Sequence, residues 1–314
     1  MKVSVIVPVY NLEHYVGPCL EGLVRQKTSF DFEVIVANDC STDASLSVIN
    51  SYLTAYPYII KVIEQRENKG LAANMLKLLS SATGEYIAYV DGDDMALPGK
   101  LQLQADYLDN NPDCSMVYHE SEVFDSQSGN ITGHYVADYY NHKYIPDKAD
   151  ITHLIRYGSF FQASSLMLRN HPNTDKTVDA KCKIILDQPF QILNAGYLGG
   201  SIGRIDKILG QYRIHPDSFG AKTLKDYARR EQVLRDQLQA ISHGADFYIE
   251  QSCIEQGQAH YYLATAMYFL KLGEISLFNK YISLSAQTDW RFDKRHEYLV
   301  ENRSDVEGCL RVLS

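Results

Sequence analysis

The sequence predicts an α/β protein whose mostly parallel sheet is covered by helices on both faces. Two observations support this fold class. Over the first hundred residues, short β-branched runs typical of strands buried on both faces alternate with segments of helical periodicity. A polar cluster also follows each of the first four runs directly, at the sheet edge where such folds bind their ligands.

Strand and helix alternate strictly in this first part of the chain, which implies neighbouring parallel strands. We expect strands at 3–7, 32–37, 59–64 and 86–90. We expect helices at 15–26, from a cap at Ser41 or Thr42 to about Tyr56, and at 71–81.

The rest of the chain is less regular. We expect a helix at 100–110, strands at 114–124, 160–169 and 203–214, and a short helix after Asp187. Beyond residue 222 helical periodicity dominates, with a helix pair at 260–272 and 275–285 around Gly273. We therefore expect an α/β domain over 1–222, with halves 1–97 and 98–222, and a small α-helical region over 223–314.

Composition and charge exclude several classes of protein. Of 314 residues, 45% are hydrophobic and 22% charged, which excludes a disordered or collagen-like chain. The formal charge of −9 is opposite in sign to that of most nucleic-acid-binding proteins, so we expect no nucleic-acid partner. No apolar run reaches the roughly 20 residues of a membrane span.

The cysteines and the N-terminus predict a location. Six cysteines lie far apart without a C-x-x-C pair, which fits a reducing compartment rather than a zinc site or a disulfide framework. The apolar run at the N-terminus stops at Pro8, too early for a secretory signal. We expect a cytoplasmic protein, with any membrane attachment peripheral and at the inner face of the membrane.

The strongest chemical signal is the acidic cluster Asp91-Gly92-Asp93-Asp94 after the fourth strand. Carboxylates this close repel one another unless a cation neutralises them. Hard divalent cations prefer such oxygens and share them with substrate phosphates, and Gly92 lets the backbone approach a ligand. The alternative, a solvated acidic turn, is disfavoured by the position after a buried strand.

Two further residues at strand ends allow two interpretations each. Asp39, after the second strand, could accept the ring N–H of a pyrimidine base or cap a helix. Tyr10, after Pro8-Val9, could stack on a base or cover the sheet edge.

Three segments together resemble a known family: MKVSVIVPVYN, VIVANDCSTD and ENKGLAANMLKLLSSATGEYIAYVDGDD. They resemble the inverting family-2 glycosyltransferases of the GT-A fold, of the bacterial type that builds cell-surface glycans and polysaccharides. The similarity is close over residues 1 to about 100 and looser to about 216. In the family's terms, 1–97 would be the nucleotide-binding half and 98–222 the acceptor-binding half.

The resemblance implies roles for the matching residues. The nucleobase, usually uracil, would be held by Pro8, Val9, Tyr10 and Asp39, and the rest of the nucleotide by Asn68, Lys69, Asp91, Gly92 and Arg213. In the D-x-D motif, Asp91 would serve the ribose and Asp93 a Mn²⁺ or Mg²⁺ ion. His215, in the segment resembling the family's Y-R-x-H, would be a second metal ligand, although a lone histidine after a strand is often structural.

The resemblance also implies a catalytic base, an Asp opening a helix about a hundred residues after the D-x-D motif. Asp187 fits by position, although Leu186 stands where the family has Glu. It would take the proton of the attacking acceptor hydroxyl. The alternatives are that Asp187 only caps the helix, or that Asp175 or Asp179 is the base. Asn38 and Cys40 also depart from the family, which has Asp and Gly there.

The expected activity is transfer of a sugar from a UDP-sugar, with inversion, by a metal-assisted single displacement. The acceptor would be a glycan, a lipid-linked glycan or a glycoprotein, and the Tyr-rich stretch 135–144 suggests carbohydrate stacking. Two alternatives are an inactive nucleotide-sugar-binding or scaffold protein and a nucleotidyltransferase, although the first loop lacks the latter's Gly-rich basic sequence. The C-terminal helices could form a homodimer contact, grip the acceptor or pack on the α/β domain, and we favour packing.

Overall fold

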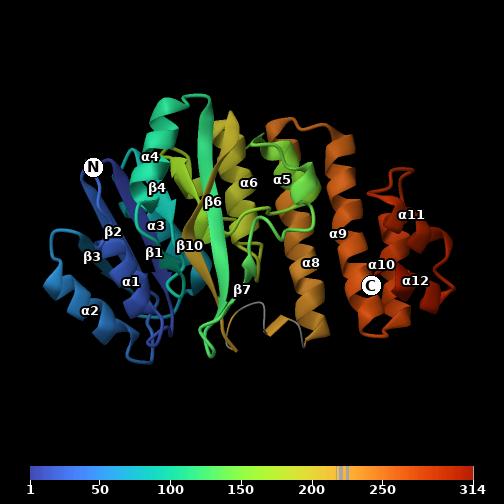
Figure 1. The fold of residues 1–314 in the computed structure, drawn as a ribbon, viewed down its shortest axis with the longest axis horizontal. Helices are drawn as coiled ribbons and strands as arrows, with labels where there is room; N and C mark the ends of the chain where they lie inside the picture. Colours follow the sequence, from blue (N-terminus) through green and yellow to red (C-terminus); the bar gives the residue numbers. More distant parts are fainter. Residues whose placement is uncertain (217, 219–221, 224–225, 314) are drawn as a thin grey trace.

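The computed structural model describes residues 1–216, 218, 222–223 and 226–313. Within these residues, ten strands form one sheet, ordered β3-β2-β1-β4-β9-β6-β10-β5, with β7 beside β6 and β8 beside β10 (Figure 1). The strands are β1 (Val3–Val9), β2 (Phe32–Asn38), β3 (Ile60–Glu64), β4 (Tyr86–Tyr89), β5 (Met95–Ala96), β6 (Cys114–Asp125), β7 (Ile131–His134), β8 (Lys148–Ala149), β9 (Met167–Arg169) and β10 (Ser201–Ile214).

The predicted parallel core is confirmed. β1 pairs in parallel with β2 and β4, and β2 with β3, so their carboxyl ends meet at one edge. β6 and β10 are also parallel to each other, but β9 lies between β4 and β6 and is antiparallel to both. The expected strand at 160–169 is wrong over its first seven residues, because only Met167–Arg169 is extended and 163–165 form a 3₁₀ turn, η2.

Helices cover both faces of the sheet, as expected. In β1, Val3, Val5 and Val7 pack into one apolar cluster, and Ile6 packs into the other. The first cluster contains α1 (Val16–Val24), α2 (Ser45–Ala55) and α4 (Lys100–Asn110). The second contains α3 (Gly70–Ser81), α5 (Ile151–Tyr157), α6 (Asp187–Leu198), α8 (Tyr227–Ser242), α9 (Gln251–Lys271), α10 (Ile275–Ser285), α11 (Lys294–Glu301) and α12 (Val306–Val312).

The C-terminal helices α8–α12 lie beyond α5 and α6, on the opposite side of the molecule from β3 (Figure 1). They share one apolar cluster with the sheet, through residues such as Leu234 of α8, Phe269 of α9 and Phe278 of α10. Packing on the α/β part is therefore observed. The domain boundary near residue 222 stays a prediction.

Two helix starts differ from expectation. Neither Ser41 nor Thr42 caps α2, because that helix begins at Ser45 and Asp43 Oδ1 accepts the Ser45 N–H at 2.9 Å. α9 begins at Gln251 rather than at residue 260, since its first turns are buried against α5.

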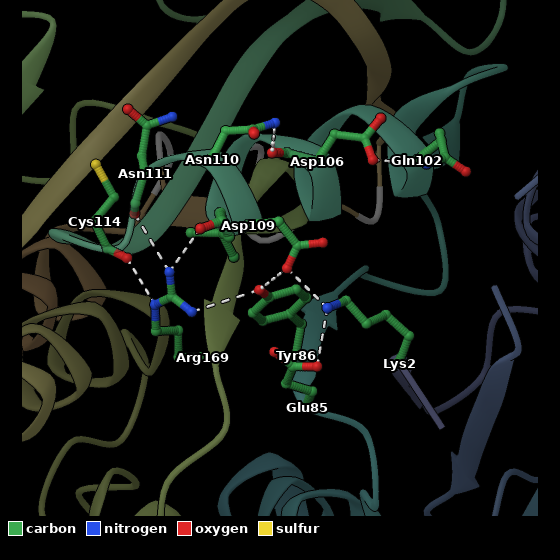
Figure 2. Close-up of polar contacts among 11 residues, drawn as sticks. Lys2, Glu85, Tyr86, Gln102, Asp106, Asp109, Asn110, Asn111, Cys114 and Arg169 are labelled. Atoms are coloured by element: carbon green, nitrogen blue, oxygen red, sulfur yellow. Dashed lines mark hydrogen bonds and ion pairs between the residues drawn. The ribbon is translucent and has the colours of Figure 1, made fainter. Parts of the chain in front are cut away.

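The amino end of the sheet is held by a network of paired charges (Figure 2). Lys2 Nζ contacts Glu85 Oε2 at 2.9 Å and Asp109 Oδ1 at 2.8 Å, and the Tyr86 hydroxyl donates to the same Asp109 oxygen at 2.6 Å. Arg169 donates to the carbonyl oxygens of Cys114 and Leu108 at 2.9 and 2.7 Å. These contacts tie the starts of β1, β4 and β6 to the end of α4.

Within the described part of the chain, no helix combines the length and apolar character that a membrane crossing requires. The six cysteine side chains are free thiols.

Candidate active site

A cavity of about 700 Å³ opens at the carboxyl ends of β1, β2 and β4. Ten of the predicted site residues line it: Pro8, Val9, Tyr10, Asp39, Asn68, Asp91, Gly92, Asp93, Asp187 and Arg213. Lys69 and His215, the other two, lie beside it. The parallel pairing of the strands therefore brings together residues from both halves of the α/β part.

The loop after β1 and the loop after β2 are joined by direct hydrogen bonds. Asn11 Oδ1, after β1, accepts the Thr42 N–H at 2.8 Å, and the Asn11 N–H donates to Ser41 Oγ at 3.0 Å. Cys40, the residue before Ser41, has a φ of 57°, in the left-handed region that favours glycine. The loop thus keeps the backbone conformation for which the family uses Gly, at a conformational cost.

Asp91 is half-buried and lines the cavity. Its carboxylate accepts the Tyr89 hydroxyl, and its N–H donates to Ser164 Oγ of η2 at 2.9 Å. Burial, followed by the negative charges of Asp93 and Asp187, raises the pKa of Asp91 to about 7. The expected repulsion between Asp91 and Asp93 is therefore present, and Asp187, from outside the acidic cluster, adds to it.

Gly92 is required by the protein itself. A Cβ at this position would lie 3.0 Å from the Pro8 carbonyl oxygen and 2.9 Å from Leu12 Cδ1. The loop after β4 therefore packs directly on the end of β1. This contact within the protein explains the glycine without the expected approach to a ligand.

Asp94 faces away from the cavity and holds the site from below. It is 1% exposed, and its carboxylate accepts the side chains of Gln162 and Ser164 and, at 3.0 Å, the Arg213 N–H. Burial and the charges of Asp93 and Asp91 raise the pKa of Asp94. This third carboxylate joins the acidic loop to η2 and β10.

Asp93, Arg213 and His215 form one contact group at the rim. His215 Nε2 lies 3.1 Å from Asp93 Oδ2, and Arg213 Nε donates to the Asp93 carbonyl oxygen at 2.7 Å. The Arg213 guanidinium lies over the rings of Tyr15 and Phe124, at 5.2 and 4.6 Å, which fixes its direction. Both residues from the Y-R-x-H segment thus reach the D-x-D motif.

The donor set at the rim fits a divalent cation. A carboxylate and an imidazole nitrogen are both ligands of Mn²⁺-like ions, and the buried His215 Nδ1 has no hydrogen-bond partner among the described residues. In the same part of the chain, no group of three or more His, Cys, Asp or Glu side chains is placed to hold a metal. Asp93 and His215 would therefore need oxygens from phosphate or water to complete the coordination.

Asp39 bonds to the start of α3, and its contact with a nucleobase stays a prediction. Its Oδ1 accepts from Gln65 Nε2 at 3.0 Å and the Lys69 N–H at 2.9 Å, and its Oδ2 accepts the Gly70 N–H at 2.8 Å. It thus stabilises the start of α3. A carboxylate has about four acceptor positions, so with respect to the described residues one position on Oδ2 remains for a donor in the cavity.

The remaining nucleotide-side residues differ in how they face the cavity. Tyr10 is 48% exposed, so its ring is available to a ligand. Asn68 lines the cavity, and its Oδ1 accepts the Gly70 N–H at 3.1 Å. The Lys69 side chain is exposed and pairs with Glu67 at 3.1 Å, so Lys69 acts here through its backbone N–H on Asp39.

Asp187 is the first residue of α6 and lines the same cavity as the acidic cluster. It is not the N-cap, which is Leu186. Burial raises the pKa of Asp187. The rivals do not line the cavity: Asp175 is exposed in η3 (Thr174–Lys176), and Asp179 accepts from Gln239 and His243 at 2.9 and 2.8 Å.

Several lining residues were not predicted. Gln162 and Ala163 line the cavity because β9, which follows η2, runs antiparallel to β4 and therefore begins at the carboxyl end of β4. Ile184 and Ile185, just before Asp187, also line it. The only sequence signal was the polar Gln162 and Ser164-Ser165 inside an otherwise apolar stretch.

A second, open groove of about 350 Å³ adjoins the cavity and shares Tyr135 and Tyr212 with it. Tyr139 and Tyr140 also line it, together with His134 and Asp138. Tyr135 and Asp187 both line the cavity, and burial raises the pKa of the Tyr135 hydroxyl. Tyrosines from the Tyr-rich stretch therefore lead away from the cavity.

Comparisons with known proteins agree with this geometry. The family model for Glycosyl transferase family 2 matches residues 4–171. Over 96 residues the chain is 42% identical to the poly(ribitol-phosphate) beta-glucosyltransferase of Bacillus spizizenii, covering 30% of this chain and 15% of that protein. The chain spans less than two thirds of the length of the curated relatives that it matches first.

Two solved structures share the fold. TarS of Staphylococcus aureus, residues 1–349 in complex with UDP-GlcNAc, has a TM-score of 0.64 and 20% identity over 99% of this chain and 88% of that one. The mannosyltransferase PcManGT of Pyrobaculum calidifontis, in complex with GDP-Man and Mn²⁺, has a TM-score of 0.61 and 15% identity over 99% and 86%. With a family match over more than half of its length and an acidic cluster at the end of β4, the chain belongs to glycosyl transferase family 2 and has the GT-A fold.

Proposed function

We propose that this enzyme transfers a sugar from a UDP-sugar to a hydroxyl of a glycan acceptor, in one displacement that inverts C1. The observation that carries the proposal is that Asp187 and the Asp91–Asp93 motif, 96 positions apart from Asp91 to Asp187, line the same cavity. This arrangement offers a proton acceptor on one side and a diphosphate site on the other. Residues 1–222 would form the catalytic domain.

The nucleotide would lie on the side of β1, β2 and α3. The Tyr10 ring is exposed for stacking on a base, and the open acceptor position on Asp39 Oδ2 suits the ring N–H of uracil. Asp91 would accept from the ribose hydroxyls. Arg213, held over two aromatic rings, would approach the diphosphate. The TarS complex with UDP-GlcNAc supports a UDP-linked donor.

In the proposed step, the acceptor oxygen forms a bond to C1 while the bond from C1 to the diphosphate oxygen breaks. The electron pair of the broken bond leaves with UDP, and the acceptor proton goes to the Asp187 carboxylate. Its raised pKa makes this half-buried carboxylate a better proton acceptor than a solvated aspartate. Attack from the side opposite to the departing group inverts the configuration.

Asp93 and His215 would hold the divalent ion, Mn²⁺ or Mg²⁺, with the diphosphate completing its coordination. When bound, such an ion offsets the negative charge that builds on the departing diphosphate. The Mn²⁺ complex of PcManGT supports metal use in this fold.

The tyrosine groove supports a glycan acceptor. Tyr135, Tyr139, Tyr140 and Tyr212 offer flat apolar faces with hydroxyl edges, and the groove shares Tyr135 and Tyr212 with the cavity that Asp187 lines. Sugar rings stack on such faces and hydrogen-bond to their edges. A cell-surface glycan precursor, met at the inner face of the membrane by a cytoplasmic enzyme, fits this groove and the six free thiols.

The deciding variant is Asp187→Asn, assayed for UDP release from UDP-GlcNAc with manganese, with water or an acceptor glycan as the nucleophile. Loss of a general base should lower turnover by about 10²–10⁴-fold. UDP should still bind, and at a hundred times its dissociation constant it should stabilise both the wild-type enzyme and Asp187→Asn by roughly 2.7 kcal/mol.

Asp175→Asn is the matched control, since this exposed carboxylate lies outside the cavity and its loss should leave turnover unchanged. Unimpaired turnover in Asp187→Asn would reject the base assignment. UDP binding without turnover in the wild-type enzyme, whatever the sugar and acceptor, would instead support a nucleotide-sugar-binding scaffold. Release of pyrophosphate from a nucleoside triphosphate would support a nucleotidyltransferase.

A further inference from the structure

The loop before Asp187 is bound by a carboxylate from the C-terminal helices. Three successive backbone N–H groups, those of Lys183, Ile184 and Ile185, donate to one oxygen, Asp236 Oδ2, at 3.1, 2.5 and 3.0 Å. Asp236 lies on α8, about 50 positions further along the chain. Successive N–H groups that converge on one point form an anion site, which here an internal side chain occupies.

Asp236 is buried and its hydrogen bonds are well defined. The residue is 1% exposed, and its second oxygen, Oδ1, accepts from Gln232 Nε2 at 2.7 Å. Hydrogen bonds to a buried carboxylate are about twice as strong as neutral ones. The bond set therefore fixes the position of the 183–185 backbone relative to α8.

Three further contacts hold the same loop at its ends. Upstream, Asp179 accepts from Gln239 of α8 and from His243, which follows it. Downstream, the Gln188 side chain donates to the Tyr261 hydroxyl of α9. The segment from 179 to 188 thus has side-chain bonds to the C-terminal helices at its start, middle and end.

This loop forms part of the cavity. Ile184, Ile185 and Asp187 all line it, and Asp187 is two residues beyond the last N–H that Asp236 binds. A shift of the 183–185 backbone would therefore move the Asp187 carboxylate. A misplacement of about 1 Å in a catalytic group can cost about a hundredfold in rate.

We infer that Asp236 is a positioning residue for the catalytic Asp187, so that the C-terminal helices are part of the catalytic apparatus rather than only a cover for the sheet. The inference rests on the proposed role of Asp187. It assigns no contact with the donor to Asp236, whose side-chain bonds to the described residues run to the loop and to α8. The expected effect is therefore on kcat and not on donor binding.

The test compares Asp236→Ala and Asp236→Asn with the wild-type enzyme, using UDP-GlcNAc hydrolysis with manganese. Asp236→Ala should lower kcat at least tenfold and change the KM for UDP-GlcNAc less than twofold. Asp236→Asn keeps one oxygen for the three N–H groups and should lose less activity than the alanine variant. Amide hydrogen exchange should accelerate at residues 183–188 in Asp236→Ala.

Asp226→Ala is the matched control, because Asp226 is also an α8 carboxylate bonded to a backbone N–H, that of Arg229, but at the far end of the helix from this loop. It should change neither kcat nor exchange at 183–188. An unchanged kcat in Asp236→Ala, or equal losses in kcat and donor affinity in both Asp236 variants, would overturn the inference.

The exchange measurement keeps this result separate from the proposed function. If the wild-type enzyme does not hydrolyse UDP-GlcNAc, the proposed donor fails, and the loop contact is still judged by exchange. Unchanged protection at 183–188 in a folded Asp236→Asn protein and in Asp236→Ala would reject the positioning role irrespective of activity.

Discussion

The two ends of the central sheet treat their charges in opposite ways. At the amino end, Lys2 bonds to Asp109 and Glu85, and the bonds from Lys2 and Tyr86 lower the pKa of Asp109 (Figure 2). At the carboxyl end, burial and the neighbouring Asp93 raise the pKa of Asp91 to about 7, and burial raises that of Asp187. The surroundings therefore favour the ionised carboxylate at the amino end and disfavour it at the carboxyl end.

This difference indicates what each end is for. The amino end is a set of mutually satisfied contacts that stabilises the fold. The carboxyl end keeps three acidic groups together in one cavity, where a bound cation or a proton would reduce their mutual repulsion. A perturbed carboxylate is therefore informative about function only when its pKa is raised without a neutralising partner, and Asp109 shows the opposite case in the same sheet.

The largest expected effect of this asymmetry is on catalysis. Asp93→Ala removes the proposed metal ligand and should lower turnover by about 10²–10³-fold, the range for loss of one electrostatic stabiliser, without lowering the melting temperature. Asp109→Ala, the counterpart at the amino end, should leave turnover unchanged. Steady-state kinetics with UDP-GlcNAc and manganese, paired with thermal unfolding, check both. If Asp109→Ala also lost turnover, the two ends would not be functionally separate.

A smaller effect is expected on stability, with opposite signs at the two ends. The folded-state pKa of Asp187 is raised above the unfolded value of about 3.9. The folded protein then binds more protons than the unfolded chain between these two values, so the contribution of Asp187 to stability falls as pH rises through that window. Asp187→Asn should therefore be more stable than wild type at pH 7, and the gap should close below about pH 4.

Asp109 provides the opposite sign. Its folded-state pKa is lowered, so its contribution is present above the unfolded value and is lost as pH falls through the folded one. Asp109→Asn should be less stable than wild type at pH 7 by up to about 1 kcal/mol, discounted because the side chain is 44% exposed. Urea unfolding at pH 7 and pH 4 measures both differences. Gaps of the same sign in the two variants would contradict the contrast.

The sequence was sufficient for the parts of the site that depend on local order. Strand ends place Tyr10, Asp39 and Asp91 at one edge because β1, β2 and β4 are parallel. It was not sufficient where tertiary packing decides. No pattern links Asp236 to the Lys183–Ile185 backbone, and the polar Ser164 inside an apolar stretch did not by itself show that η2 would bond with Asp94.

The smallest expected effect concerns Lys69, which sequence similarity assigns to the nucleotide. Its side chain is exposed and pairs with Glu67, while its backbone N–H donates to Asp39. Since a side-chain substitution leaves that N–H in place, Lys69→Ala should change the dissociation constant for UDP less than about twofold, in line with the modest worth of exposed charge pairs. Asp39→Ala removes the acceptor itself and is the matched contrast, with a clear loss of UDP binding by isothermal titration calorimetry. A loss in Lys69→Ala as large as in Asp39→Ala would mean that the lysine turns into the cavity when nucleotide binds, and that the acidic carboxyl end recruits a cation from its own chain.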